Sequence, residues 1–186
     1  CIKCNNVNIN YDVSGSGPAV LLLHGNSANL HFFDALTQRL QNTYTVYRMD
    51  SRCHGESEKT KEINYDLMTE DTADFIRQLS IRQPALIGSS DGGITGLLLT
   101  IRHPHLLSCH IPCGANTTVA GLKRWFYWTF KLGYLKTRSP LFVMVVQQPD
   151  ITPQQLAGII TPTLVMAGSR GIMTNGHTRQ IAADIP

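Results

Sequence analysis

The sequence predicts an α/β fold, in which a mostly parallel central sheet is flanked by helices. The main observation is that short apolar runs typical of buried strands alternate with segments whose apolar residues recur at helical spacing. The length of 186 residues suits one domain with a sizeable core. Hydrophobic residues make up 42% of the chain and charged residues 16%, as in ordinary globular proteins. We therefore expect a single domain over residues 1–186.

Six strands are predicted in chain order. The stretch VNINYDV alternates apolar and polar residues, as a half-buried strand does. The stretch AVLLLH is continuously apolar, as in a strand covered on both faces. The predicted strands are 7–13, 19–24, 44–50, 85–88, 106–113 and 163–168.

Helices are predicted between these strands, at 32–40, 65–79, 94–101 and 175–184. The exception to the alternation is 117–161, which is helical in pattern, rich in aromatic residues and basic. We interpret this stretch as a short helical cap inserted above the carboxyl edge of the sheet, where such folds bind ligands.

Composition argues against several classes of function. A net charge of +3 is too small, and too scattered, to predict nucleic-acid binding. No run of about 18 apolar residues occurs, so no membrane span is predicted. The first residues, CIKCNNVNIN, have no basic start and no apolar stretch, so no signal peptide is expected.

The five cysteines are few and odd in number, which is typical of free thiols in a reducing compartment. We therefore expect a cytoplasmic location. Cys1 and Cys4 form a CxxC pair, but Cys109 and Cys113 lie in an apolar, strand-like run. The sequence thus predicts neither a metal site nor a cofactor.

The stretch IGSSDGG contains a candidate nucleophile. The pattern G-x-S-x-G fits Gly88, Ser90 and Gly92, and it lies between a predicted strand and a predicted helix. Glycines on both sides of a serine permit a very sharp turn, with the hydroxyl exposed at its tip. The alternative is that Ser90 is an ordinary helix N-cap.

A nucleophilic serine also needs donors for the oxyanion that forms on the substrate. The backbone N–H of Asp91 follows the serine directly. The loop HGNSAN offers the backbone N–H of Asn26 as the second donor.

With these pieces in view, the chain resembles the α/β-hydrolase fold superfamily, near its small-cap esterases, lactonases and peptidase-like serine hydrolases. The matching stretches are LLLHGN, MDSRCHGES, GSSDGG and TPTLVMAGSR, in the family's order. The resemblance implies hydrolysis of an ester, thioester, lactone or amide, with a small acyl compound as substrate. It does not choose among substrates, because one fold hosts many chemistries.

The catalytic partners of the serine depart from the family pattern. The family's acid position, after the strand TLVMAG, is occupied by Gly171. Asn116 is the nearest candidate at an alternative acid position, but it carries no charge. The family's histidine follows one strand later, and we expect that C-terminal strand and its helix to be missing from this sequence. His177 has the right order but falls in a predicted helix, while His24 and His54 lie in turns.

Two explanations stay open. The sequence is either a fragment of a longer hydrolase or a hydrolase-like chain that has lost its chemistry and binds a ligand or a partner. An incomplete sheet also leaves an open edge, through which a homo-oligomer can form. Cys53 replaces a glycine of the family's turn, either as a tolerated substitution or as a redox thiol beside His54.

The aromatic stretch 121–138 admits three interpretations: a lid that lines an acyl pocket, a helix at a membrane surface, or a lid that only packs on the sheet. Under the first, we expect Trp125, Phe126 and Trp128 to face the pocket above Ser90.

Overall fold

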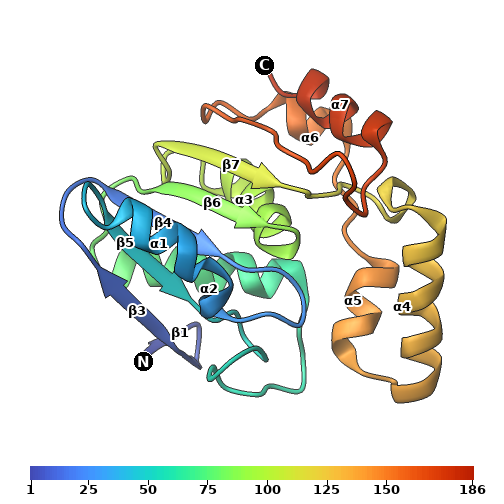
Figure 1. Cartoon of the computed structure of the whole chain (residues 1–186), viewed down its shortest axis with the longest axis horizontal. Coiled ribbons are helices and arrows are strands. Elements are labelled where there is room, and N and C mark those ends of the chain that lie inside the picture. The colour runs from blue at the N-terminus through green and yellow to red at the C-terminus, as the bar shows by residue number, and fades with distance from the viewer.

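The computed structural model describes all 186 residues and has the predicted α/β architecture. Five strands form the central sheet (Figure 1). Their spatial order is β3 (Tyr11–Ser14), β5 (Thr45–Met49), β4 (Ala19–Leu23), β6 (Ala85–Ser89) and β7 (Cys109–Cys113). Neighbouring strands run parallel except for β3, which is antiparallel to β5. The prediction of a mostly parallel sheet is therefore confirmed.

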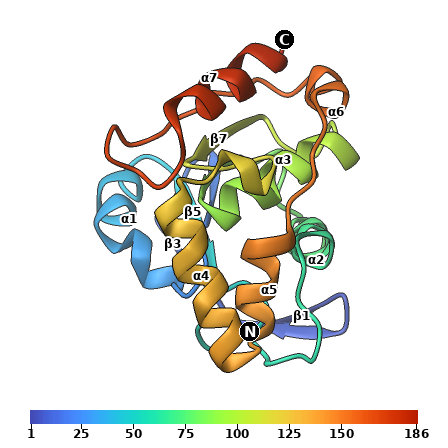
Figure 2. The same cartoon turned by 90° about the vertical axis from the view of Figure 1, so that its right-hand side faces the viewer.

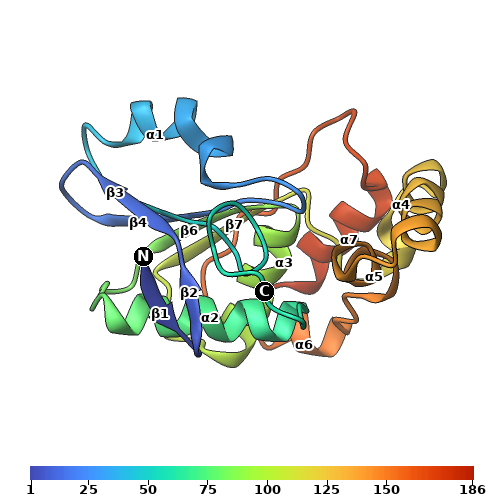
Figure 3. The ribbon, with the colours of Figure 1, turned by 90° about the horizontal axis from the view of Figure 1, so that it is seen from below.

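Helices cover both faces of this sheet. Figure 3 shows α1 (Asp34–Leu40) on one face, with α2 (Tyr65–Gln78) and α3 (Asp91–Arg102) on the other. The short 3-10 helix Leu30–Phe33 leads into α1. Strand β4 shows why its sequence is apolar throughout: Leu21 and Leu23 pack in the cluster with Phe75 of α2, while Val20 and Leu22 pack in the opposite cluster with Phe33.

The predicted strand 7–13 is two strands. The antiparallel pair β1 (Ile2–Cys4) and β2 (Val7–Ile9) stands apart from the main sheet, and β3 joins it. The break falls at Asn10, whose backbone N–H donates to the Ser57 hydroxyl at 2.8 Å and whose carbonyl accepts from the backbone of Asp50 at 2.9 Å. Pairing with the loop after β5 thus turns the chain between β2 and β3.

The predicted strand 163–168 is reduced to two isolated parallel bridges with β7. Along this edge His110 N–H donates to Pro162 and Gly114 N–H donates to Met166, at 2.9 and 2.7 Å. Pro112 lies midway between these two donors and has no N–H, so the middle bond of the ladder is absent. A proline in β7 therefore interrupts the last strand of the sheet.

The predicted cap 117–161 contains a 3-10 turn at Val119–Gly121, α4 (Arg124–Thr137), α5 (Pro140–Gln147) and α6 (Pro153–Ala157). Helices α4 and α5 lie side by side and project beyond one end of the sheet (Figures 1 and 2). Helix α6 instead packs with α3 and with the last helix, α7 (Asn175–Asp184). The projecting part of the cap is therefore the α4–α5 pair.

Candidate functional site

Ser90 occupies a sharp turn between β6 and α3, as the glycine pattern predicts. Its backbone angles are φ 49° and ψ −112°, a conformation that residues with side chains rarely adopt. A Cβ on Gly88 would lie 2.3 Å from the carbonyl oxygen of Gly92, and a Cβ on Gly92 would lie 2.1 Å from that of Leu23. Neither glycine can be replaced without moving backbone, so the turn requires both.

The Ser90 hydroxyl makes no capping bond to α3, although Ser90 occupies the N-cap position. The side chain is half-buried and borders two cavities. The first lies under the cap and leaves about 20 Å³ for a water-sized sphere. The second is larger, about 270 Å³, and lies between Ser90, Cys113 and the loop around Gly168 and Gly171. The hydroxyl is thus available to small molecules rather than committed to the helix.

The loop after β4 packs directly against this serine. A Cβ on Gly25 would lie 3.1 Å from the Cβ of Ser90. The next residue, Asn26, borders the first cavity, and its backbone N–H has no acceptor in the protein. The N–H of Asp91 belongs to the first turn of α3, where helical N–H groups have no carbonyl partner. Both predicted oxyanion donors therefore flank Ser90.

The side chain of Asp91 is a feature that the sequence does not reveal. It is buried in the wall of the first cavity and accepts a hydrogen bond from the Tyr65 hydroxyl through Oδ1, at 3.0 Å. Its Oδ2 has no partner. Burial raises the pKa of Asp91 to about 6, and the hydrogen bond from the Tyr65 hydroxyl offsets part of that rise. The same burial, with the adjacent Asp91, raises the pKa of Tyr65 well above its ordinary value.

Only one of the three predicted pocket aromatics reaches the first cavity. Phe126 lines it together with Phe130, one helical turn further on, whereas Trp125 and Trp128 are 62% and 49% exposed on the other side of α4. The prediction for the two tryptophans is wrong because aromatic residues occur all round this helix. Sequence clustering alone does not show which side faces the sheet. The remaining apolar wall consists of Leu122, Val145, Ile172 and Met173.

The acid position is close to Ser90 but holds no acid. Gly171 borders the second cavity, in a tight turn where its N–H donates to the carbonyl of Gly168 at 2.9 Å. Asn116 borders the first cavity and donates from its side chain to the carbonyl of Thr118 at 3.0 Å. The arrangement at both acid positions therefore supplies no carboxylate.

No histidine lines either cavity. His177 accepts a hydrogen bond from the backbone N–H of Thr117 at 3.0 Å through Nε2 and packs against Gly121. His24 likewise accepts from the backbone N–H of Ser51 at 3.1 Å, and burial lowers its pKa to about 4. These two imidazoles hold loops together.

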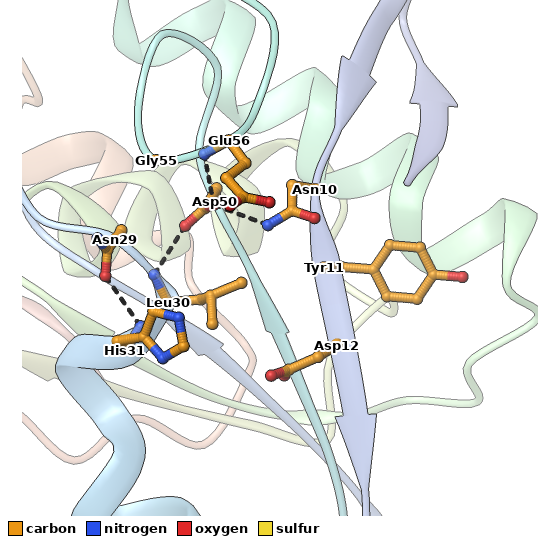
Figure 4. Close-up of a pocket in the computed structure, with 9 residues that line it drawn as sticks. All are labelled: Asn10, Tyr11, Asp12, Asn29, Leu30, His31, Asp50, Gly55 and Glu56. Carbon is orange, nitrogen blue, oxygen red and sulfur yellow. Dashed lines mark hydrogen bonds between the residues drawn. The ribbon is translucent and has the colours of Figure 1, made fainter.

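A further hollow of about 440 Å³ lies between the start of β3, the end of β5 and the 3-10 helix before α1 (Figure 4). Asp50 is its central carboxylate, and both oxygens are occupied. Oδ1 accepts from the N–H of Leu30, while Oδ2 accepts from the Asn10 amide and the N–H of Glu56. Asp50 thus braces the surrounding loops. The chain has no cluster of three His, Cys, Asp or Glu side chains placed to hold a metal ion.

Comparison with known proteins agrees with this geometry. A family model described as the alpha/beta hydrolase fold matches residues 18–138. An uncharacterized hydrolase of Bacillus subtilis, YraK, is 34% identical over 108 residues, which are 56% of this chain and 40% of that protein. A fluoroacetate dehalogenase from a Burkholderia species is 38% identical over 109 residues, 55% of this chain and 36% of that protein.

Among solved structures, the enol-lactonase of Burkholderia xenovorans LB400 superposes with a TM-score of 0.82 at 18% identity, covering 99% of this chain and 87% of that one. The curated relatives named above are thus matched over less than half of their length, while the fold agrees across nearly the whole of this chain. The family match spans more than half of the sequence and includes the turn at Ser90. The chain belongs to the α/β-hydrolase fold family, and its relatives include hydrolases and esterases.

Proposed function

We propose that Ser90 is the nucleophile of a serine hydrolase that cleaves an acyl ester, thioester, lactone or amide. The observation that carries this proposal is the strained turn at Ser90, with its uncommitted hydroxyl between two cavities. In the proposed reaction Ser90 Oγ attacks the acyl carbon, and the serine proton passes to the leaving group. The bond to the leaving group then breaks, and water releases the acyl group from the serine.

The oxyanion of this reaction would be bound by the backbone N–H groups of Asn26 and Asp91. Backbone donors are fixed by the fold, so they need little reorganisation as charge develops. The N-terminus of α3 favours the same negative charge. The reaction as proposed uses neither a metal ion nor a cofactor.

The substrate would be a small acyl compound with an apolar acyl group. The wall of the first cavity is mostly apolar, and Phe126 and Phe130 come from the cap. Because this cavity leaves only about 20 Å³ free, a substrate would enter only as α4 and α5 move away from Ser90.

A catalytically inactive ligand-binding protein is the second candidate. It is favoured by one observation, that neither cavity next to Ser90 is lined by a histidine to take the serine proton. In that case the cavity and the uncommitted Oδ2 of Asp91 would bind a ligand without covalent chemistry.

The test compares three proteins: the unchanged chain, Ser90→Ala and the matched control Ser89→Ala. Each is treated with a fluorophosphonate probe and with p-nitrophenyl acetate, and the modified peptide is located by mass spectrometry. We expect slow labelling at Ser90 in the unchanged chain and in Ser89→Ala, and none in Ser90→Ala. Saturable ligand binding that is equal in all three proteins, with no label on Ser90, would support the inactive alternative instead.

A further inference from the structure

Helix α4 exposes an apolar stripe on the side that faces away from the candidate site. We call Trp125, Trp128, Leu132 and Leu135 the outer stripe. Their exposed fractions are 62%, 49%, 59% and 53%, and their spacing of three, four and three residues places them on one helix face. Exposed large apolar residues are unremarkable singly, but a contiguous row of four indicates an interaction surface.

The opposite side of α4 is already occupied. Phe126 and Phe130 line the Ser90 cavity, and Phe130 stacks edge-on against Phe142 of α5 with ring centroids 5.3 Å apart. Helix α5 approaches closely because residue 133 is glycine, where a Cβ would lie 3.2 Å from the Phe142 ring. Rotating α4 to bury the outer stripe would therefore expose its phenylalanines, so no rearrangement of α4 itself covers the stripe.

The charge around the stripe is of one sign. Residues 115–149 contain no Asp or Glu. They contain five basic residues: Lys123, Arg124, Lys131, Lys136 and Arg138. Lys131 holds its ammonium group 4.9 Å from the ring centroid of Trp128, so charge and stripe are in direct contact. A partner that complements both the apolar stripe and the basic residues around it has an apolar layer beneath a negatively charged surface.

We propose that the outer stripe docks α4 on an anionic lipid bilayer. Tryptophan rings suit the headgroup level of a membrane, while lysine and arginine stems cover apolar surface and keep their charges among the headgroups. Each basic residue near an anionic surface adds attraction. Figures 1 and 3 show α4 at the outer edge of the molecule, with no other element over it. No helix has the length and apolar character needed to cross a bilayer.

A second copy of the chain is the competing partner. The three-four-three spacing also fits the seam between two packed helices. However, such a pair would bring ten basic side chains together without any acidic residue from 115–149 to offset them, since each copy contributes five. The charge pattern thus favours anionic lipid over self-association.

Intrinsic fluorescence gives a direct test, because Trp125 and Trp128 are the only two tryptophans in the chain. Vesicles of phosphatidylcholine with about a third phosphatidylserine should shift the emission to the blue and co-sediment the protein. With pure phosphatidylcholine vesicles, the blue shift and the co-sedimented fraction should both be smaller by at least about fivefold. Raising the salt concentration should weaken the binding, because exposed charges are screened.

The key variant is Leu132→Glu with Leu135→Glu, which leaves both reporters in place. We expect it to lower vesicle binding by about tenfold or more. The matched control is Phe32→Glu, since Phe32 is equally exposed, at 60%, on the 3-10 helix before α1. Binding by this control should be unchanged, and Ser90→Ala should also bind normally, so that the result does not depend on the proposed chemistry.

Three outcomes would overturn the proposal. The first is equal binding to neutral and anionic vesicles. The second is co-sedimentation without a blue shift, which would mean charge attraction with the stripe still in water. The third is a dimer in sedimentation-velocity runs without lipid that Leu132→Glu dissociates, which would assign the stripe to a second copy of the chain.

Discussion

At the scale of single residues, the backbone of Ser90 is held in a conformation that glycine adopts more easily. Such strain amounts to about 1–3 kcal/mol and persists only where the surroundings enforce it. Here the surroundings are the crossing of α3 over β6 and the packing of Gly25 against the serine Cβ. Because this strain lowers stability, we interpret the turn as a means of placing the Ser90 hydroxyl beside the cavities.

The first prediction follows from this strain. Ser90→Gly should raise the free energy of unfolding by about 1 kcal/mol, because relief of strain exceeds the added chain entropy of glycine. Ser90→Ala should leave that free energy nearly unchanged, since alanine keeps the Cβ. Urea titration of the three proteins measures this. If Ser90→Gly is less stable than Ser90→Ala, the turn is not strained in the way described.

The second prediction concerns the buried carboxyl of Asp91. Its pKa is raised from 3.8 to about 6. At a pH between these two values, the carboxyl is therefore protonated in the folded protein and ionised in the unfolded chain. Stability therefore falls as the pH rises from about 4 to about 6, and stays lower above. Asp91→Asn should remove this loss and stabilise the protein at pH 8 by up to about 3 kcal/mol. At pH 4 it should have little effect.

The measurement is urea unfolding of both proteins at pH 4 and pH 8. Asparagine keeps an oxygen that accepts the Tyr65 hydroxyl, so that hydrogen bond is retained. Equal stabilisation at both pH values would contradict the prediction.

At the scale of elements, β7 carries a histidine that has no polar partner. His110 is fully buried against α3, where its Nε2 lies 2.1 Å from the place a Cβ on Gly96 would occupy. Neither ring nitrogen is hydrogen-bonded, and burial lowers its pKa to about 3. The strand therefore packs on the helix only while this imidazole is neutral.

The third prediction uses this dependence. The pKa of His110 in the folded protein lies below the ordinary 6.5. The contribution of neutral His110 to the free energy of unfolding is therefore fully present above pH 6.5 and is lost as the pH falls toward 3. His110→Leu should reduce the slope of unfolding free energy against pH in that window by at most about 1.4 kcal/mol per pH unit. His105→Leu is the control, because it removes an imidazole from an exposed position. Identical slopes in all three proteins would contradict the prediction.

At the scale of the whole molecule, the candidate site is assembled from separate segments. The turn after β6 supplies Ser90, the loop after β4 supplies Asn26, and the cap supplies Phe126 and Phe130. The segment after β7 brings Gly171 to the second cavity. The segment that pairs with β7 exposes Ile160, Leu164 and Met166. Pairing of this edge of the sheet with a further strand or with a second copy of the chain remains a prediction.

The fourth prediction is about this assembly. We expect the 186-residue chain to hydrolyse p-nitrophenyl esters weakly, through the backbone donors and binding alone, which leave about 10³–10⁴-fold over water in dismantled serine enzymes. Gly171→Asp alone should stay within a few-fold of the unchanged chain, because no imidazole is placed for the new carboxylate to orient. Extending the chain by the family's C-terminal strand and histidine should raise the rate more, and the two changes together most.

Each of these four proteins is compared with its own Ser90→Ala variant. Full-strength, Ser90-dependent turnover by the unchanged chain would contradict the prediction. It would mean that His177 or another histidine moves to act as the base.

The sequence by itself determined the fold class and the turn at Ser90. Both depend on local patterns: strands and helices follow the spacing of apolar residues, and the turn follows glycines at fixed distances from the serine. The absence of an acid at Gly171 is equally local. These features need no knowledge of what lies across the sheet.

Only the tertiary structure decided which sides of α4 are buried, that Asp91 shares a wall with Tyr65, and that the strand expected at 163–168 is interrupted. Trp125 and Phe126 are adjacent in sequence, but Trp125 is exposed and Phe126 lines the cavity. Which of the two is covered depends on where α5 and the sheet lie. Asp91 and Tyr65 are 26 residues apart and meet only through the packing of α2 on α3. Pro112 disrupts its neighbour because its missing N–H faces that strand. In each case the deciding contact joins segments that are distant in sequence. The spacing of residues within one segment therefore cannot predict it.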